Sequence, residues 1–295
     1  MTTLLETLLP NLSHRGKVRD LYDLGDRLLI VATDRISAFD VVLPNGVPGK
    51  GAVLTQLSAF WFARTASVVP NHFLRLADGS PDDNLPFELP RELIGRSTIV
   101  RKAERLPVEC IVRGYMAGTA WAEYQAESTV CGVHVPPGIQ ESAQFPEPLF
   151  TPTTKADAGH DENLTVDEFV SLIGVEAANA VRLRSLALYR YGADYARQHG
   201  IIIADTKFEF GLLGGEPIVI DEILTPDSSR FWDATQHKAG THMEAFDKQY
   251  VRDWLAASGW DRKPPAPALP PEVVEETSRL YREIYARITG NDLRQ

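Results

Sequence analysis

Residues 201–222 constrain the fold more than any other part of the sequence, because two strongly apolar runs there flank Gly214-Gly215. Paired glycines adopt the positive φ values of tight turns, so the pattern predicts an antiparallel hairpin. Alternate side chains of a strand share a face, which places Asp205, Lys207 and Glu209 on one side and aromatic side chains on the other. One face of this strand is therefore charged, although the rest of the hairpin is apolar.

Acidic side chains from both arms of this hairpin are expected at one end, since Asp221 and Glu222 close the second arm. Two carboxylates about 4 Å apart repel each other by about 4 kcal/mol at an effective dielectric constant of about 20. A divalent cation would reverse that repulsion, so we predict a magnesium site. The alternative is a solvated strand edge, which the apolar runs Ile201–Ile203 and Ile218–Ile220 disfavour. A register slip of one residue would turn Asp221 to the other face.

The composition of the 295 residues, with 44% apolar and 24% charged side chains, is that of a folded globular protein. A formal net charge of −10 would repel nucleic acid or an anionic membrane surface, so we expect neither as a partner. Only Cys110 and Cys131 occur, each in a strand-like run, which favours packing roles in a reducing compartment. The N-terminal residues lack the pattern of a signal peptide. We therefore expect a cytoplasmic protein.

The order of the predicted elements is that of an α+β protein, because strands come in runs and do not alternate regularly with helices. We divide the chain into a mostly antiparallel β lobe (1–105), an α+β lobe (106–260), and a proline-rich spacer with a C-terminal helix packed on the body (261–295). The prolines of residues 136–163 predict a long loop. The spacing of apolar residues predicts helices over 53–67, 176–199, 244–257 and 272–288. A capping box at Thr165 predicts the start of one more helix.

Three further segments combine glycine or hydroxyl residues with cations. Thr225–Arg230 predicts a turn whose hydroxyls, N–H groups and guanidinium cradle an anion, the alternative being an ordinary turn with a stacked arginine. Arg113–Thr119 lies where a predicted strand is followed by a helix, and the first N–H groups of a helix can bind an anion. The alternative is an ordinary turn between the two elements. Gly16–Asp20 has the pattern of a loop over nucleotide phosphates, and a solvated hairpin is its common alternative.

Five motifs stand out along the chain: Gly16-Lys17-Val18-Arg19-Asp20, Asp34-Arg35-Ile36-Ser37-Ala38-Phe39-Asp40, Leu106-Pro107-Val108-Glu109-Cys110-Ile111-Val112-Arg113-Gly114-Tyr115, Asp205-Thr206-Lys207-Phe208-Glu209-Phe210-Gly211 and Asp221-Glu222-Ile223-Leu224-Thr225-Pro226-Asp227-Ser228-Ser229-Arg230. Together they resemble SAICAR synthetases, in the order expected for that family and between about residues 13 and 257. The C-terminal helices with their proline spacer resemble the longer, yeast-like form. The resemblance implies a two-lobed α+β fold related to the ATP-grasp and protein-kinase-like nucleotide binders, with ATP between the lobes.

The resemblance implies an ATP-dependent ligase of de novo purine biosynthesis. Such an enzyme joins the carboxylate of carboxyaminoimidazole ribonucleotide (CAIR) to the amine of L-aspartate, giving SAICAR, ADP and phosphate. A carboxylate is a poor electrophile, so ATP first converts it to an acyl phosphate, a step that depends on positioning and charge neutralisation. By analogy with the longer form, we expect a monomer.

The resemblance also implies a role for particular residues of this chain. Catalysis falls to Lys207, which stabilises charge on the transferred phosphoryl group, and to Asp205, which orients it. Glu209 and Asp221 hold magnesium between ATP and the substrate carboxylate. The nucleotide phosphates lie against Gly16, Lys17, Val18 and Arg19; the substrates contact Ser37, Asp40, Lys50, Gly51, Arg113, Thr119, Asp227, Ser229 and Arg230. No general base for the aspartate amine is assigned.

Two other functions share parts of this pattern. A small-metabolite kinase would use the same metal and phosphate groups but would release a phosphorylated product without L-aspartate. A nucleotide-sensing module would bind without turnover, and the pairing of Glu209 with Asp221 argues against it, because a sensor needs no bridging metal.

Overall fold

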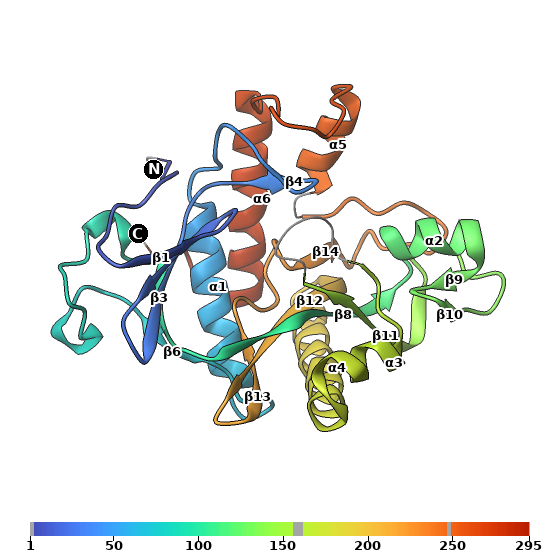
Figure 1. Cartoon of the computed structure of the whole chain (residues 1–295). Helices are drawn as coiled ribbons and strands as arrows, with labels where there is room; N and C mark the ends of the chain where they lie inside the picture. The colour runs from blue at the N-terminus through green and yellow to red at the C-terminus, as the bar shows by residue number, and fades with distance from the viewer. Residues whose placement is uncertain (1–2, 156–161, 247–248, 295) are drawn as a thin grey trace.

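Two five-stranded antiparallel sheets form the framework of the protein, and the computed structural model describes residues 3–155, 162–246 and 249–294. In Figure 1 the first sheet lies on the left and the second runs from the centre to the right. The first has the order β1 (Leu12–Arg15), β2 (Arg19–Asp23), β3 (Arg27–Ala32), β7 (Ser97–Arg101), β6 (Phe73–Leu76). The second has the order β11 (Gln144–Thr154), β8 (Glu104–Tyr115), β12 (Ile201–Leu213), β13 (Glu216–Ile220), and β14 (Ser229–Asp233) also pairs with β12.

The α+β class expected from the sequence is confirmed, and so is the hairpin of β12 and β13. Along β12, Phe208 and Phe210 are fully buried in the main hydrophobic core. The Lys207 ammonium lies 3.8 Å from a Glu209 carboxylate oxygen, so these two side chains share the opposite, charged face. The alternation of the sequence thus translates directly into the two faces of the central strand.

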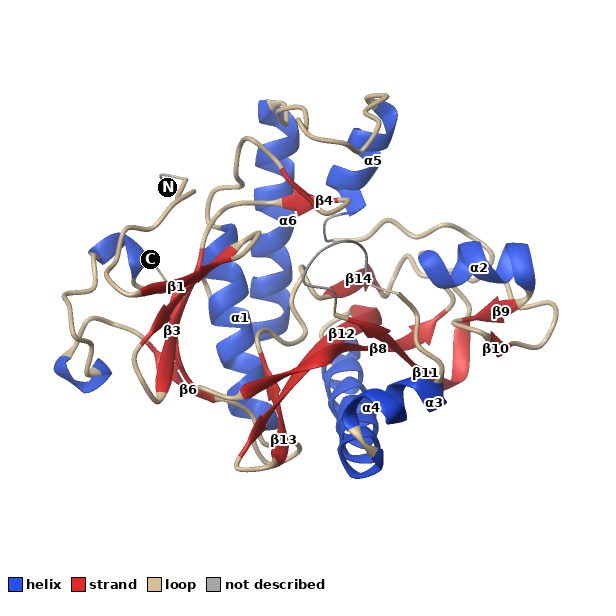
Figure 2. Cartoon of the chain, viewed as in Figure 1, coloured by secondary structure: helices blue, strands red, loops and turns tan. Residues whose placement is uncertain are grey.

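Two long helices, α1 (Lys50–Thr65) and α6 (Pro271–Thr289), pack against each other between the sheets (Figure 2). Leu54, Leu57 and Trp61 of α1 recur at helical spacing and are buried in the same core as β8 and β12. The helix begins three residues before the predicted 53–67, directly after Gly49, whose φ of 81° a residue with a side chain rarely adopts. One core therefore joins the N-terminal, central and C-terminal segments.

Helix α4 (Val175–Gln198) covers the second sheet, and α3 (Val166–Ile173) precedes it. The predicted capping box is present: the Glu168 N–H donates to Thr165 Oγ1 at 3.2 Å, and the Thr165 N–H donates to Glu168 Oε2 at 2.8 Å. Helix α5 (Gln249–Ala257) is shorter than the predicted 244–257, of which residues 247–248 lie outside the described residues. No helix in the described part of the chain combines the length and apolar character needed to cross a bilayer.

The prediction of a loop over 136–163 is wrong for residues 144–154 in its middle, because β11 (Gln144–Thr154) forms there and pairs with β8. Strand β11 lies at the edge of the sheet, where a proline removes no central hydrogen bond. Its register shifts between Gln144 and Leu149, which accommodates Pro146 and Pro148. Residues 156–161 of the predicted loop lie outside the described residues.

Shorter elements complete the described chain. Helix α2 (Thr119–Glu127) follows β8 and packs on the two-stranded ladder of β9 (Thr129–Val130) and β10 (Val133–His134). A second small ladder joins β4 (Ser37–Ala38) to β5 (Val41–Val42), and Ala38 belongs to a buried apolar cluster with residues of α5 and α6. Two 3₁₀ turns, η1 (Pro81–Asp83) and η2 (Arg91–Leu93), lie between β6 and β7.

Replacing Gly192 of α4 by alanine should destabilise the protein, although helix propensity alone favours alanine by about 1 kcal/mol. The new Cβ would lie 2.5 Å from Cδ1 of Leu224, which is fully buried. Overpacking of this kind costs about 1–3 kcal/mol, so urea titration should give a lower free energy of unfolding. The double variant Gly192→Ala/Leu224→Ala should lose less than the two single losses added together. Strict additivity would contradict the proposed contact.

Candidate active site

Two glutamates face each other directly on neighbouring strands of the second sheet: Glu109 of β8 pairs in register with Glu209 of β12. Both side chains are nearly buried, at 7% and 8% exposure. Like charges opposite each other destabilise a sheet unless cations intervene. Lys155 donates to carboxylates of both glutamates, at 3.2 Å to Glu109 Oε1. Lys207 also reaches Glu109 Oε1, at 2.6 Å.

These contacts set the protonation states of the cluster. Burial would raise the pKa of Glu209, but the nearby cations Lys155, Lys207 and Arg19 outweigh it and hold that pKa below its usual value. Burial likewise opposes the charge on Lys207, whereas Glu109 and Glu209 raise its pKa overall. Glu209 and Lys207 are therefore both charged at neutral pH.

Asp221 lies at the end of β13, one residue after the position that pairs with Glu209. Its φ of 67° belongs to the left-handed region, which aspartate tolerates better than most residues. Arg19, from β2 of the first sheet, donates to Asp221 Oδ2 at 2.7 Å and lies 3.3 Å from a Glu222 oxygen. This ion pair joins the N-terminal sheet to the carboxylates of the second sheet.

Burial raises the pKa of Asp221 to about 7, opposed by Arg19 and reinforced by the charges of Glu209 and Glu222. Asp221 and Glu209 thus share one electrostatic environment. A cavity of about 20 Å³ adjoins Asp221 and Glu222, which is room for one water-sized ligand. Ser58 also lines it, and its hydroxyl is buried with no hydrogen-bond partner among the described residues.

This donor set suits magnesium bound together with a phosphate. Carboxylate oxygens are hard ligands, and Mg²⁺ is commonly held by one or two of them with the remaining positions given to water and substrate phosphates. Within residues 3–155, 162–246 and 249–294, no three His, Cys, Asp or Glu side chains gather as a closed metal-binding group. Glu209 and Asp221 offer two carboxylates, a number that fits a magnesium ion bound together with nucleotide phosphates.

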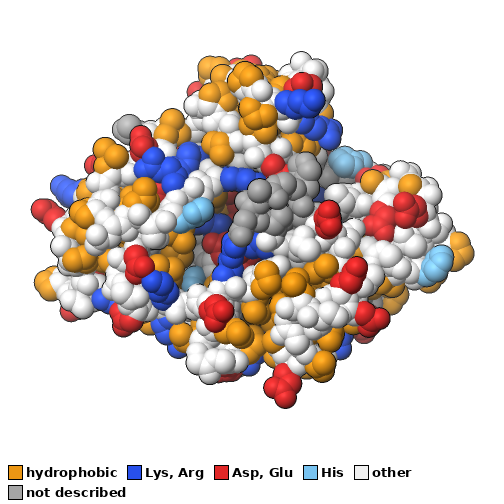
Figure 3. All heavy atoms as spheres, in the orientation of Figure 1, with side chains coloured by type: hydrophobic (Ala, Val, Ile, Leu, Met, Phe, Trp, Pro, Cys, Tyr) orange, Lys and Arg blue, Asp and Glu red, His pale blue; other side chains and the backbone are white. Residues whose placement is uncertain are grey.

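A cavity of about 220 Å³ opens beside this cluster, lined by residues of β8, β12, α2, α5 and the segment before β14. Figure 3 shows Lys and Arg side chains around the central hollow of this face, with acidic side chains deeper in it. Four cations and two carboxylates line the cavity, so its charge favours an anionic ligand. Seven residues predicted for the site line it: Arg113, Thr119, Asp205, Lys207, Asp227, Ser229 and Arg230.

Asp205 lies between two arginines at the wall of this cavity. Arg230 donates to Asp205 Oδ2, and the Arg113 guanidinium lies 3.8 Å from the same oxygen. Gly118 packs against Arg230: a Cβ at this position would lie 2.5 Å from Arg230 Nη2, so a side chain here would push the guanidinium aside. Arg113 also donates to Thr119 Oγ1 at 3.4 Å, which links the end of β8 to the start of α2.

A turn is present at Thr225–Ser228, as predicted, and Ser229 and Arg230 already belong to β14. The N–H groups of Ser228 and Ser229 donate to the Thr225 carbonyl at 3.1 and 2.8 Å. Asp227 accepts hydrogen bonds on both carboxylate oxygens: Lys50 donates to Oδ2 at 2.7 Å and Tyr281 to Oδ1 at 2.7 Å. The side chain of Lys50 is fully buried, so Lys50 reaches the cavity through Asp227.

The remaining predicted residues lie outside the lining of this cavity. The Gly16 N–H donates to the Arg19 carbonyl at 2.8 Å, which closes the turn between β1 and β2, and Val18 is buried there. Lys17 pairs with Asp40 at 2.5 Å, and both side chains are about half exposed. Ser37 lies on β4, close in sequence to Asp40. Gly51, in the first turn of α1, donates its N–H to Asp34 Oδ1 at 2.9 Å.

Four residues of the site received no role from the sequence: Glu109, Lys155, Arg252 and Tyr281. Glu109 lies in a run that the sequence identifies as strand-like. Its role would have been found only by pairing that strand with β12, where Glu109 faces Glu209. Lys155 follows a strand that the prolines concealed, and Arg252 and Tyr281 lie on helices more than 20 residues from any recognised motif. Only the three-dimensional arrangement brings these side chains to the cluster and the cavity.

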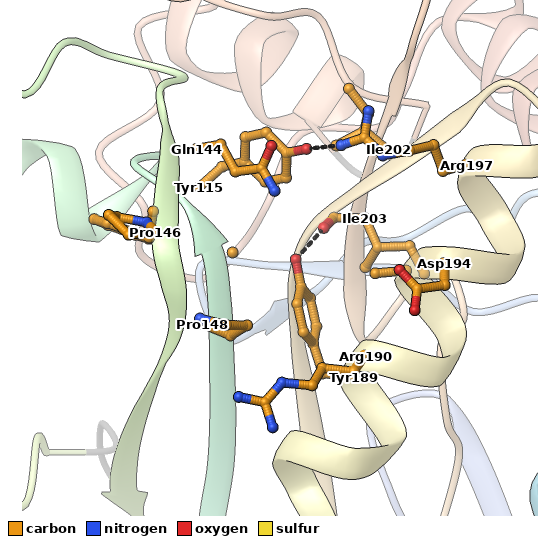
Figure 4. Close-up of a pocket in the computed structure, with 13 residues that line it drawn as sticks. Tyr115, Gln144, Pro146, Pro148, Tyr189, Arg190, Asp194, Arg197, Ile202 and Ile203 are labelled. Atoms are coloured by element: carbon orange, nitrogen blue, oxygen red, sulfur yellow. Dashed lines mark hydrogen bonds between the residues drawn. The ribbon is translucent and has the colours of Figure 1, made fainter.

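A second cavity, of about 130 Å³, lies between α4 and strands β8 and β11, where β11 departs from its partner (Figure 4). The Tyr189 hydroxyl donates to the Ile203 carbonyl at 2.8 Å, and Arg197 donates to the Tyr115 hydroxyl. Burial raises the pKa of both tyrosines, so both hydroxyls are protonated at neutral pH. None of the predicted site residues lines this cavity, which separates it from the charged face of β12.

Comparisons with known proteins agree along nearly the whole chain. The family model described as SAICAR synthetase matches residues 12–267. A phosphoribosylaminoimidazole-succinocarboxamide synthase of Syntrophobacter fumaroxidans is 53% identical, over 98% of this chain and 97% of the relative. The structure of SAICAR-synthase from Saccharomyces cerevisiae complexed with SAICAR is 42% identical, with a TM-score of 0.90, over 99% of this chain and 100% of the yeast chain.

A further structure, of a SAICAR synthetase in complex with ADP, is 25% identical with a TM-score of 0.71, and the similarity covers 96% of this chain and 99% of that one. The resemblance found in the five motifs is therefore confirmed over the whole fold, the C-terminal helix included. This chain belongs to the SAICAR synthetase family.

Proposed function

We propose that this protein condenses CAIR with L-aspartate at the expense of ATP, giving SAICAR, ADP and phosphate. Its activity is that of a phosphoribosylaminoimidazole-succinocarboxamide synthase, a ligase of de novo purine biosynthesis. One observation carries the mechanism: a cavity with four cationic side chains adjoins a buried cluster of carboxylates. An anionic substrate and the phosphates of ATP can meet only where both kinds of charge are neutralised.

The nucleotide would lie between the two sheets. Arg19 already bridges them, and we assign it, with Gly16, Lys17 and Val18, to the phosphates of ATP. A related structure with ADP supports nucleotide binding by the family. Glu209 and Asp221 would hold Mg²⁺, which when bound neutralises phosphate charge and polarises the transferred group. Lys155 and Arg19 keep these two carboxylates compensated before the metal arrives.

The ribonucleotide would occupy the 220 Å³ cavity. Arg113 and Arg230 offer planar guanidinium groups that match phosphate or carboxylate, while Thr119 and Ser229 offer hydroxyls. The yeast relative, which was solved with SAICAR, supports a site for such an anion. We assign Ser37, Asp40, Lys50, Gly51 and Asp227 to the remaining substrate pocket, Lys50 acting through Asp227.

The chemistry begins with the carboxylate of CAIR, which ATP would convert to an acyl phosphate. Lys207 lines the cavity and contacts the carboxylate cluster, so its ammonium can stabilise charge on the phosphoryl group during transfer. Asp205, held by Arg113 and Arg230, would keep the substrate groups oriented toward Lys207. The amine of L-aspartate then attacks the activated carbonyl carbon and phosphate leaves.

We further propose that the enzyme is monomeric and cytoplasmic. Its two lobes and C-terminal segment would meet at the boundaries expected from the sequence, after residues 105 and 260.

ADP release with one substrate omitted at a time tests this function. The ligase requires CAIR and L-aspartate together for turnover and yields SAICAR in equal amount to ADP. A small-metabolite kinase would release ADP with L-aspartate absent and would leave a stable phosphorylated product. A nucleotide-sensing module would release none under any combination.

Replacing Asp221 by asparagine should lower kcat by about 100-fold and raise the Mg²⁺ concentration needed for half-maximal rate, because one metal ligand loses its charge. Steady-state rates across a Mg²⁺ titration measure both. Asp233→Asn is the matched control, because Asp233 lies outside the site. Its carboxylate pairs with the Arg287 guanidinium, and the two groups are 2.9 Å apart. Unchanged magnesium-dependent turnover in Asp221→Asn would show that the metal assignment is wrong.

Replacing Arg230 by lysine should raise the KM for CAIR by about 10- to 100-fold and leave the KM for ATP within about twofold, because an ammonium cannot reproduce the guanidinium fork. Arg287→Lys, which alters a comparable Arg–Asp pair outside the cavity, should leave both constants unchanged. If Arg230→Lys raised the KM for CAIR and the KM for ATP equally, the assignment of Arg230 to the ribonucleotide would be wrong.

A further inference from the structure

We infer that Tyr281, on the C-terminal helix α6, is a positioning residue for the substrate cavity, and this inference rests on the proposed function. Its hydroxyl donates to Asp227 Oδ1 at 2.7 Å, while Lys50 of α1 donates to the other oxygen at 2.7 Å. Tyr281 is fully buried, as is the side chain of Lys50, and only 2% of the Asp227 side chain is exposed. Three segments far apart in the sequence thus meet at one carboxylate.

Asp227 is part of the wall of the cavity. It lies in the turn that leads directly into β14, whose first two residues are Ser229 and Arg230, and all three residues line the cavity. The Thr225 carbonyl accepts hydrogen bonds from the N–H groups of Ser228 and Ser229, which ties the turn to the first residue of β14. A displacement of Asp227 would therefore disturb the start of β14, where Ser229 lines the cavity and Arg230 contacts Asp205.

The same contacts keep the cavity attractive to anions. An uncompensated carboxylate at Asp227 would repel a ribonucleotide phosphate or carboxylate. The ammonium of Lys50 and the hydroxyl of Tyr281, neither of which lines the cavity, each contact one oxygen of this carboxylate, and Lys50 also lies 5.9 Å from the centre of the Tyr281 ring. The cationic groups of the cavity then determine its charge.

Helix α6 is well anchored for this task. Ser278, one turn before Tyr281, donates to the Pro48 carbonyl at 2.6 Å. Tyr285, one turn after it, donates to Gln56 Oε1 of α1 at 3.4 Å. These two contacts fix the position of α6 along the axis of α1. The Tyr281 hydroxyl in turn holds the carboxylate of Asp227 in place. Tyr285 also has a buried hydroxyl that donates to a side chain, but its partner Gln56 does not line the cavity, which makes Tyr285 the control.

The test compares Tyr281→Phe with Tyr285→Phe in the full chain, because both changes keep the ring and remove one hydroxyl. We expect Tyr281→Phe to raise the KM for CAIR by about tenfold, from loss of a hydrogen bond to a charged group, with kcat and the KM for ATP within about twofold. Tyr285→Phe should leave all three constants within about twofold. Thermal unfolding of both variants separates these effects from loss of folded protein.

Two results would overturn the inference: equal changes in the two variants, or a KM for ATP that rises together with the KM for CAIR. A second comparison remains decisive even where Tyr281→Phe loses stability. If Tyr281 acts through Asp227, the KM change of Asp227→Asn/Tyr281→Phe is smaller than the product of the two single changes, and a full product contradicts it. Wild-type protein that makes no SAICAR would instead refute the proposed function.

Discussion

The electrostatic opposition of Glu109 and Glu209 on adjacent strands constrains the rest of the structure. Two nearly buried carboxylates in register would destabilise the second sheet if they stood alone. Lys155 and Lys207 neutralise them, and Arg19 does the same for Asp221 nearby. The site therefore concentrates charge of both signs in a small, partly buried volume, which is what phosphoryl transfer between anions requires.

This arrangement also explains why the two sheets and the two central helices act together. Arg19 comes from the first sheet and Asp221 from the second, so their ion pair fixes the separation across which a nucleotide would lie. Lys50 and Tyr281 come from α1 and α6 and meet Asp227 at the substrate cavity. The hydrophobic core shared by α1, α4, α6, β8 and β12 supplies the rigid support for these polar contacts.

Sequence patterns predicted the features that depend on local order. The alternation from Asp205 to Phe210 placed the charged and apolar faces of β12, and the Thr165–Glu168 pair located the start of α3, because period and capping are properties of neighbouring residues. Six of the seven predicted residues that line the cavity belong to three of the motifs, and the seventh, Thr119, lies four residues after one of them.

Features that depend on tertiary pairing could not be predicted in this way. The prolines of β11 indicated a loop, whereas the edge position of the strand tolerates them. Lys155, Glu109 and Tyr281 carry no local signal for their roles, since each acquires its partner from a different part of the chain. The register of β8 against β12 is the missing information, and it emerges only when both strands are packed on one core.

The central claim is that Glu209 and Asp221 meet at one divalent ion together with the nucleotide phosphates. Crystals grown with Mn²⁺ and ADP test it most directly, because manganese scatters anomalously and substitutes for magnesium at oxygen ligands. The account predicts an anomalous peak within about 2.5 Å of a carboxylate oxygen of each residue and of a phosphate oxygen. A nucleotide bound with its metal on other side chains, and with Glu209 still held by Lys155 and Asp221 by Arg19, would contradict it.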